Sequence, residues 1–306
     1  TAGVVRAFVE HKVYNNPDPA KWYYVGPMFR YERPQAGRNR QFHQFGVEVF
    51  GATDPALDAE VILLGHSYFT SLGLQNVRVV INSVGDQDSR ALYREKLIEY
   101  FEMHQDYLNE EAKSRLYKNP MRILDSKDQN MKAITTNAPS ILDYLSEKDK
   151  IHFDSVLRYL ELLGIPYEVD HRLVRGLDYY QQTAFEYTVD MPGSQASTLG
   201  GGGRYHGLVK EVGGPEVPGI GFGIGLERVL LALQHQNISI PTKNQLDSYL
   251  ICIGDEAKSS AVRILHDLRT AGFRVDMDYL DRKPKAQFKT ADRRGVQFVV
   301  IVGESE

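Results

Sequence analysis

Two segments near the start of the chain alternate between apolar and polar residues and predict a β-hairpin. Residues 22–31 are mostly aromatic and apolar, and residues 41–50 would place their side chains on two faces in turn. Pro34 and Gly37 supply turn residues between them. The connection is basic and contains no lysine; its arginines are Arg30, Arg33, Arg38 and Arg40.

The second of these strands has two unlike faces. On one face Gly46 lies between Gln44 and Glu48, and a glycine in that place leaves room for a ligand on the sheet. The hairpin therefore offers arginines for an anion and a carboxylate for a cation. An edge hairpin with a solvated basic loop is the alternative interpretation. We expect the other face to point toward the core; its residues are His43, Phe45, Val47 and Val49.

Helical spacing dominates the next part of the chain. Asp54 and Pro55 form a good start for a helix that extends to about residue 72. A short apolar strand follows at residues 77–82. From about residue 86 to 170 strand patterns are absent, which predicts a helical insert within a sheet domain. The helical segments expected there are residues 89–108, 110–117, 140–145 and 149–163.

Strand character returns with the sequence LVRGLDYY at residues 173–180 and continues to residue 189. An arginine, an acid and two tyrosines beside a glycine favour a polar pocket with aromatic walls. Two core tyrosines beside a surface arginine would fit the same residues. Further on, residues 198–208 (TLGGGGRYHGL) contain four consecutive glycines, which permit a close approach of the backbone to a small ligand. A Walker A loop is excluded because no Gly-Lys-Ser/Thr follows.

Glycine also occupies every second position from 219 to 225 in GIGFGIGLERVLLAL, a predicted strand that leads into a helix. One face of this strand is bare backbone, against which a planar base or a ribose can lie. The spacing is not that of a dinucleotide-binding fingerprint. Arg228 falls in the first turn of the helix, where a cation opposes the helix dipole. That position favours a role in binding, the alternative being a tolerated surface arginine.

The last part of the chain predicts a separate small unit. After a linker at residues 241–244, strands and helices alternate as β-α-β-α-β from residue 248 to 302. A basic segment within it could contact RNA phosphates, and a solvated helix face explains it equally well. Its charged residues are Arg282, Lys283, Lys285, Lys289, Arg293 and Arg294.

Composition narrows the possible classes of protein. A chain of 306 residues holds one large domain and a smaller one, and 42% hydrophobic with 25% charged residues is typical of a globular protein. The net charge of −4 argues against attachment to nucleic acid by bulk charge, so any RNA contact must be local. The single cysteine, Cys252, excludes an internal disulfide framework and a cysteine zinc site. With no apolar run long enough to span a membrane and no visible signal peptide, we expect a cytoplasmic protein.

The motifs carry a family resemblance that covers nearly the whole chain. Residues 29–51 (FRYERPQAGRNRQFHQFGVEVFG) resemble motif 2 of the class II aminoacyl-tRNA synthetases, and residues 219–233 resemble motif 3. LVRGLDYY is similar to the signature peptide that sets histidyl-tRNA synthetases, here of the bacterial type, apart from other class II enzymes. Family members often carry a cysteine before the glycine run and an acid or amide after the tyrosine, where this chain has Gly200 and His206.

The resemblance implies an α+β fold. Residues 1–240 would form a class II antiparallel sheet with flanking helices and a helical insert at about 86–170, and residues 245–306 part of an α/β anticodon-binding domain. In the family the insert contacts the acceptor arm of the tRNA, although packing alone would also explain it. The chain opens at Thr1 inside a helical pattern and ends after a strand, without a match to the dimerisation motif 1. We therefore expect a fragment that lacks motif 1 and the C-terminal end, and its activity in isolation stays open.

The implied activity is that of a histidine–tRNA ligase, a cytoplasmic homodimer in the family. Histidine is activated by ATP, with Mg²⁺ on the phosphates and no cage of protein metal ligands, and then passes to the 3′ end of the histidine tRNA. This chemistry needs charge neutralisation and alignment, for which arginine is suited. The residues implied for catalysis are Arg30, Arg175 and Arg228. Those implied for ATP are Arg30, Glu32, Arg38, Phe42 and Arg228. Those implied for histidine are Thr1, Gln44, Glu48, Arg175, Tyr179, Tyr180 and Tyr205.

Two other classes of protein share parts of this pattern. The regulatory subunit of ATP phosphoribosyltransferase is a synthetase-like protein that senses histidine without charging tRNA. That subunit should lack the intact LVRGLDYY peptide and the anticodon-binding unit. This chain contains the peptide and the start of a C-terminal α/β unit. The glycine, threonine and proline enzymes of class II are more remote alternatives, and the same peptide argues against them.

Overall fold

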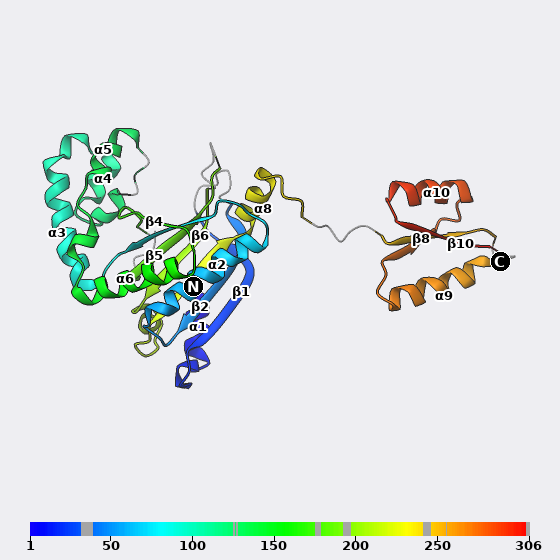
Figure 1. The fold of residues 1–306 in the computed structure, drawn as a ribbon, viewed down its shortest axis with the longest axis horizontal. Coiled ribbons are helices and arrows are strands. Elements are labelled where there is room, and N and C mark those ends of the chain that lie inside the picture. The colour runs from blue at the N-terminus through cyan, green and yellow to red at the C-terminus, as the bar shows by residue number, and fades with distance from the viewer. Residues whose placement is uncertain are drawn as a thin grey trace. The chain divides into compact units, whose positions relative to one another are not determined.

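The structure, a computed structural model, describes residues 1–31, 39–124, 126, 128–174, 179–191, 197–240, 246–254 and 256–303. The chain divides into two compact units, Thr1–Ser239 and Ile240–Glu306, which we describe one at a time (Figure 1). The predicted linker at residues 241–244 lies outside the described residues. No helix in the described ranges combines the length and the apolar character needed to cross a membrane.

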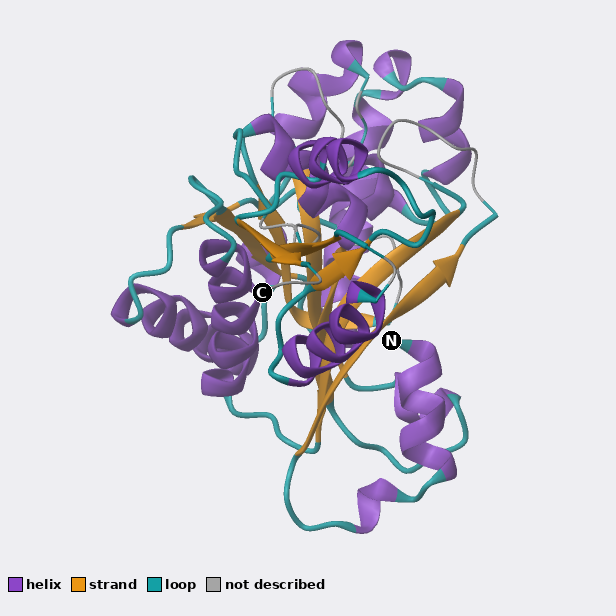
Figure 2. Cartoon of the chain, turned by 90° about the vertical axis from the view of Figure 1, so that its right-hand side faces the viewer, coloured by secondary structure: helices purple, strands orange, loops and turns teal. Residues whose placement is uncertain are grey.

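A seven-stranded sheet forms the centre of the first unit. Its neighbouring strands are antiparallel except for the pair β3 and β4, which is parallel. The chain enters at one edge with a hairpin and later inserts two strands beside it, so segments far apart in sequence become neighbours (Figure 1). Figure 2 draws the strands in orange and the helices in purple from a second direction. In spatial order the strands are β1 (Ala20–Phe29), β2 (Gln41–Phe50), β7 (Gly219–Gly225), β6 (Thr198–Tyr205), β5 (Tyr180–Thr188), β3 (Arg78–Ser83) and β4 (Tyr167–Val169).

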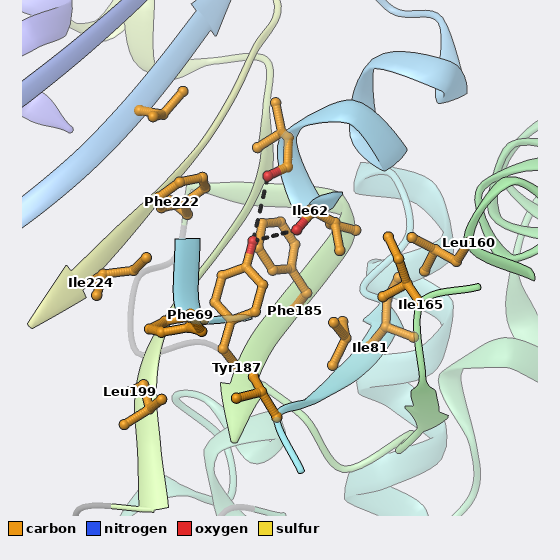
Figure 3. Packing of buried hydrophobic residues seen from close by; sticks show 14 of the residues in the cluster. Ile62, Phe69, Ile81, Leu160, Ile165, Phe185, Tyr187, Leu199, Phe222 and Ile224 are labelled. Carbon is orange, nitrogen blue, oxygen red and sulfur yellow. Dashed lines mark hydrogen bonds between the residues drawn. The ribbon is translucent and has the colours of Figure 1, made fainter. Parts of the chain in front are cut away.

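One face of this sheet carries the main hydrophobic core. Helices α2 (Pro55–Ser71), α6 (Glu147–Leu162) and α8 (Leu226–His235) supply the side chains that pack against it. Figure 3 shows the packing around Tyr187, whose buried hydroxyl donates hydrogen bonds to the carbonyl oxygens of Val61 and Ile62 at 3.4 and 3.1 Å. Each such bond satisfies a polar atom that would otherwise be costly to bury.

A buried charge cluster also joins the sheet to two of these helices. Arg204 on β6 is fully buried and pairs with Asp58 on α2, and His152 on α6 lies 3.3 Å from the same carboxylate. Burial alone would raise the pKa of Asp58, but the hydrogen bond from His152 and the charge of Arg204 bring that pKa below its ordinary value. Removing one partner of such a cluster is strongly destabilising because it leaves a buried charge unpaired.

The helical insert has a core of its own. Tyr93, Leu97 and Phe101 on its first helix are fully buried among residues of the insert. Its helices are α3 (Gln87–Met103), α4 (Glu110–Arg115) and α5 (Lys132–Thr136), with 3₁₀ turns η2 (Gln105–Tyr107), η3 (Pro120–Ile123), η4 (Gln129–Met131) and η5 (Ile141–Tyr144). The remaining helical segments of the unit are α1 (Ala2–Glu10), η1 (Val13–Asn15) and α7 (Leu208–Glu211).

The second unit is a three-stranded parallel sheet with two helices. Strand β8 (Ser248–Cys252) lies between β10 (Phe298–Val302) and β9 (Val275–Met277). Helices α9 (Ala257–Thr270) and α10 (Pro284–Arg293) connect them. Two residues of the predicted basic segment form ion pairs within the unit. Arg282 pairs with Asp278, and Arg294 pairs with Asp276.

The predicted α+β class is confirmed, and one local interpretation needs correction. We expected the glycine run at 200–203 to permit a close approach of the backbone to a small ligand. It is instead part of β6, a central strand paired on both sides. A Cβ on Gly202 would lie 1.9 Å from the carbonyl oxygen of Gly221, so glycine is needed there for neighbouring strands to approach.

Candidate active site

The face of the sheet opposite the main core carries the candidate site. Along β2 the alternation predicted from sequence holds, since Phe45, Val47 and Val49 pack in the core while Gln44 and Glu48 face the other way. His43 departs from the prediction. It is exposed at the rim, where its backbone N–H and ring meet Glu227 of α8 at 2.8 to 3.1 Å.

Glu48 is the central polar residue of this face. Its side chain is fully buried, and Oε2 accepts a 2.7 Å hydrogen bond from the Tyr205 hydroxyl. Oε1 has no hydrogen-bond partner among the described residues, and Thr1, the first residue of this sequence, lies beside it with its backbone nitrogen 3.5 Å away. Burial raises the pKa of Glu48, and the hydrogen bond from Tyr205 only partly opposes this rise. The site therefore holds a carboxylate with unused capacity for a cationic hydrogen-bond donor.

Glycines on neighbouring strands create the space for these polar side chains. In the register of the sheet Glu48 faces Gly221, and a Cβ on that glycine would lie 2.1 Å from Oε2. A Cβ on Gly219 would lie 2.3 Å from the Tyr205 ring in the same way. The alternating glycines of β7 thus make room for side chains of the protein itself.

Tyr24 is a residue that sequence reasoning missed. We expected Gly46 to leave room for a ligand, but the ring of Tyr24, its direct cross-strand neighbour, fills that space. A Cβ on Gly46 would lie 2.2 Å from the ring. Its hydroxyl also accepts a 3.5 Å hydrogen bond from the Thr1 amine. The alignment of an aromatic residue with a glycine on the adjacent strand becomes visible only once the register of the hairpin is known.

Three further tyrosines form an aromatic wall beside Glu48. Tyr179 and Tyr180 have ring centroids 4.7 Å apart, and Tyr179 meets Tyr205 edge-on at 5.7 Å. Burial raises the pKa of Tyr179 and of Tyr205, and nearby ionisable groups raise both further. These hydroxyls are therefore neutral near pH 7 and act as hydrogen-bonding groups.

The predicted phosphate-binding arginines lie toward one end of β2 and β7. The Arg30 guanidinium stacks over the Phe42 ring, with 4.1 Å from Cζ to the ring centroid, and its Nε donates a 2.7 Å hydrogen bond to the Asn39 carbonyl. Arg228 lies in the first turn of α8 and donates from Nη1 to the Thr198 carbonyl at 2.6 Å. Its neighbour Glu227 binds residue 43, so α8 is attached to the strand that carries Phe42.

The structure brings together most of the predicted site residues and does not describe the others. Thr1, Glu48, Tyr179, Tyr180 and Tyr205 form one connected cluster. Gln44 lies on the same face, where a Cβ on Gly223 would lie 3.3 Å from the Gln44 Nε2. The predicted residues Glu32, Arg38 and Arg175 lie outside the described residues, as do Arg33 and Asp178. Within the described part of the chain no group of acids, histidines and cysteines is arranged to hold a metal ion.

A largely antiparallel sheet carries a buried carboxylate and an aromatic wall on the face opposite its main core. With a helical insert and a following small α/β unit, this is the architecture of a class II aminoacyl-tRNA synthetase. The family model for histidyl-tRNA synthetase matches residues 1–229, and the anticodon binding domain matches residues 247–306. The chain belongs to the histidyl-tRNA synthetase family.

Individual relatives agree with this assignment. The histidine–tRNA ligase of Lactiplantibacillus plantarum is 52% identical over all of this chain and 73% of its own length. That of Geobacillus kaustophilus is 53% identical over all of this chain and 72% of its own length. Apo histidyl-tRNA synthetase of S. aureus superposes with a TM-score of 0.83 at 45% identity, over 99% of this chain and 74% of that one. A protein from Bacillus halodurans described as an ATP phosphoribosyltransferase regulatory subunit/histidyl-tRNA synthetase shares the fold, with a TM-score of 0.67 at 19% identity over 99% of this chain and 78% of that one.

Proposed function

We propose that the protein is a histidine–tRNA ligase. In the first step an oxygen of the histidine carboxylate attacks the α-phosphorus of ATP, and the bond to the β-phosphate breaks to release pyrophosphate. In the second step a ribose hydroxyl at the 3′ end of the histidine tRNA attacks the adenylate carbonyl and AMP leaves. The observation that carries the proposal is identity of 52% over the whole chain to proteins that bear this name.

Histidine would bind at the Glu48 cluster. A buried carboxylate with an unpartnered oxygen suits the ammonium or imidazole of the amino acid, because a charged hydrogen bond in a dry site is strong. Gln44 would bind the other polar end, and Thr1 would lie near the ammonium. Tyr179, Tyr180 and Tyr205 would surround the ring. Such a site rejects apolar amino acids because they would leave its buried polar groups unpaired.

ATP would lie across the other end of β2 and β7. We assign Arg30 to the α-phosphate, Arg228 to the γ-phosphate and Phe42 to the base, which an aromatic ring can stack against. Glu32 and Arg38 complete the ATP site in this proposal. Arg175 would stabilise charge at the α-phosphate while histidine attacks. Mg²⁺ would bind mainly to the phosphate oxygens, in keeping with its preference for few protein ligands.

The remaining proposals concern the molecule as a whole. Residues 1–240 would form the catalytic domain, with the insert at about 86–170, and residues 245–306 part of the domain that binds the anticodon. The exposed Lys285 and Lys289 of α10 favour contact with RNA phosphates. We also propose a homodimer and a cytoplasmic location, and membership of the histidyl-tRNA synthetase family supports both.

The test is exchange of pyrophosphate into ATP, measured with each amino acid in turn on the protein as its host makes it. We expect exchange with histidine alone, and we expect Arg175→Ala to lose it. Full exchange by Arg175→Ala would remove that residue from the mechanism. Histidine binding without any exchange would favour the regulatory-subunit alternative, for which the likeness at 19% identity supports the fold alone.

A further inference from the structure

Strand β5 contains an irregularity directly beside the tyrosine wall. Between Tyr180 and Ala184 it uses four steps where β6, between Tyr205 and Gly203, uses two. Gln182 lies inside this bulge with a φ of 55°, in the left-handed region that long side chains rarely adopt. Such backbone conformations persist only where their surroundings hold them, and they cluster at functional sites.

Hydrogen bonds hold both the backbone and the side chain of Gln182 in place. Its backbone N–H donates to the Gly85 carbonyl at 3.0 Å, and its carbonyl accepts from the Val84 N–H at 2.7 Å. The side-chain Nε2 donates to Oδ1 of Asp149 at 2.7 Å. Gln182 is 7% exposed and Asp149 1% exposed, so this bond is shielded from water.

Asp149 connects the bulge to both ends of the helical insert. Its second oxygen, Oδ2, accepts a 2.7 Å hydrogen bond from the backbone N–H of Asp86, the N-cap of α3. Asp149 itself lies in the first turn of α6, whose N-cap is Ser146. The Ser146 hydroxyl donates to Asp86, and its N–H donates to the hydroxyl of Ser89. The points where the insert leaves and rejoins the sheet domain are therefore locked to each other and to Gln182.

On its other side the bulge ends at Tyr180. The Tyr180 ring lies against Gly203, where a Cβ would come within 2.8 Å of it, and it contacts Tyr179. The Tyr180 carbonyl accepts a 3.0 Å hydrogen bond from Nη1 of Arg90, which is on α3. Two separate connections thus run from the start of the insert to this tyrosine, one through Arg90 and one through Asp149 and Gln182.

We propose that Gln182 and Asp149 are positioning residues that hold Tyr180 in the histidine pocket and make histidine affinity depend on the position of the helical insert. Burying a carboxylate and holding a glutamine in the left-handed region both cost free energy. Gln182 is the next residue but one after Tyr180, which lies in the proposed pocket. The inference rests on the proposed role of Tyr180 in binding histidine.

The test exchanges the donor and the acceptor of the buried hydrogen bond between Gln182 and Asp149. Gln182→Glu sets two carboxylates against each other, and we expect the KM for histidine in pyrophosphate exchange to rise about tenfold or more. The KM for ATP should stay within about twofold, since Arg30 and Phe42 are on other strands. In the double variant Gln182→Glu/Asp149→Asn, the new amide can donate to Glu and still accept from the Asp86 N–H. We expect it to restore the histidine KM to within about threefold of the unaltered protein.

A second pair of variants isolates the Arg90 connection. Arg94 is on the same helix, and its guanidinium bonds only within the insert, to the Tyr117 carbonyl, among the contacts described. Arg90→Ala should raise the histidine KM, whereas Arg94→Ala should leave it unchanged. Thermal unfolding of each variant shows which ones are folded.

The results separate this inference from the proposed function. An unchanged histidine KM in Gln182→Glu overturns it. So does an equal rise of the histidine and ATP KM values that the double variant fails to reverse, because that indicates general loss of structure. Both outcomes presuppose exchange by the unaltered protein, so absence of that exchange refutes the proposed function and is recognisable as such.

Discussion

Glu48 shows how a single side chain can be costly to the fold and useful to the site. It is fully buried, and within the described part of the chain one of its oxygens lacks a hydrogen-bond partner. Ordinary core residues are not left in that state, because an ionised carboxylate away from water needs compensation. The compensation that Tyr205 provides is incomplete. A bound ammonium or imidazolium would complete it.

Glu48→Gln should therefore stabilise the protein while abolishing histidine-dependent exchange. Burial raises the pKa of Glu48 above its ordinary value of 4.5, so the folded protein holds this proton more tightly than the unfolded chain. The stability that this proton contributes is full below pH 4.5 and is lost as pH rises through the raised pKa. Urea unfolding over a pH series should show the variant more stable near neutrality, with the difference vanishing in acid. A less stable variant at neutral pH would mean that the bond to Tyr205 outweighs burial.

Tyr205→Phe should weaken histidine binding. The change removes a 2.7 Å hydrogen bond to a buried carboxylate, a loss of about 1.5–3 kcal/mol, or roughly ten- to hundredfold in affinity. Tyr187→Phe is the matched control, since it removes a buried hydroxyl that bonds to carbonyls in the main core. It should lower stability by about 1 kcal/mol and leave the histidine KM unchanged. Equal effects of the two variants on that KM would argue against the assigned role of Tyr205.

At the scale of elements, the strands adjacent to the site depend on glycine for close packing. Gly221→Ala would place a Cβ 2.1 Å from Glu48 and 2.3 Å from the Val47 carbonyl oxygen, so the carboxylate or the backbone must move. We expect a loss of about 1–3 kcal/mol in unfolding free energy together with loss of histidine binding. Gly225→Ala, on the same face of the same strand, has its nearest atoms at 3.8 Å and should cost under about 1 kcal/mol. Urea unfolding and histidine titration of both variants would test this, and indifference to Gly221→Ala would contradict it.

Much of the element pattern could be predicted because it depends on local periodicity. Residues 41–50 were expected as a strand and form β2, and the cap at Asp54 begins α2 with a hydrogen bond to the Ala56 N–H. Strand β4, three residues long and only partly buried, lacks enough alternation to be detected. The role of the glycines depends on which strand lies opposite, and that register is not visible in a single sequence.

The candidate site was predictable in part for the same reason. Glu48 stood out because a carboxylate and an amide flank a glycine on one strand face. Tyr24 did not, because its importance comes from its alignment with Gly46 across the hairpin. The bulge at Gln182 was also missed, since a glutamine gives no local sign of a left-handed backbone.

At the scale of the whole molecule, the proposed function assigns histidine recognition and RNA recognition to different units. The first unit holds the Glu48 cluster, and the second carries the exposed lysines of α10 on an independent sheet. Amino acid activation and tRNA binding should therefore respond to different substitutions. The net charge of −4 makes the local basic surface more important for RNA than any long-range attraction.

Lys285→Glu should raise the KM for tRNA in aminoacylation severalfold and reduce its dependence on salt. Pyrophosphate exchange should not change, because it requires no RNA. Arg263→Glu on α9 introduces the same change of charge on the other exposed helix and serves as the control. If both variants affect tRNA equally, the effect comes from net charge and not from a contact of α10.

The order of the strands also has a consequence for biosynthesis. Glu48 and Tyr205 are 157 residues apart, and β2 meets its other neighbour, β7, only after both have been made. At about 5–20 residues per second, the hairpin β1–β2 waits roughly 8–30 s on the ribosome before the pocket can close. Tyr23, Val25 and Phe29 remain exposed on this edge strand even in the finished unit. During translation the nascent hairpin is thus open to pairing with another copy of the chain.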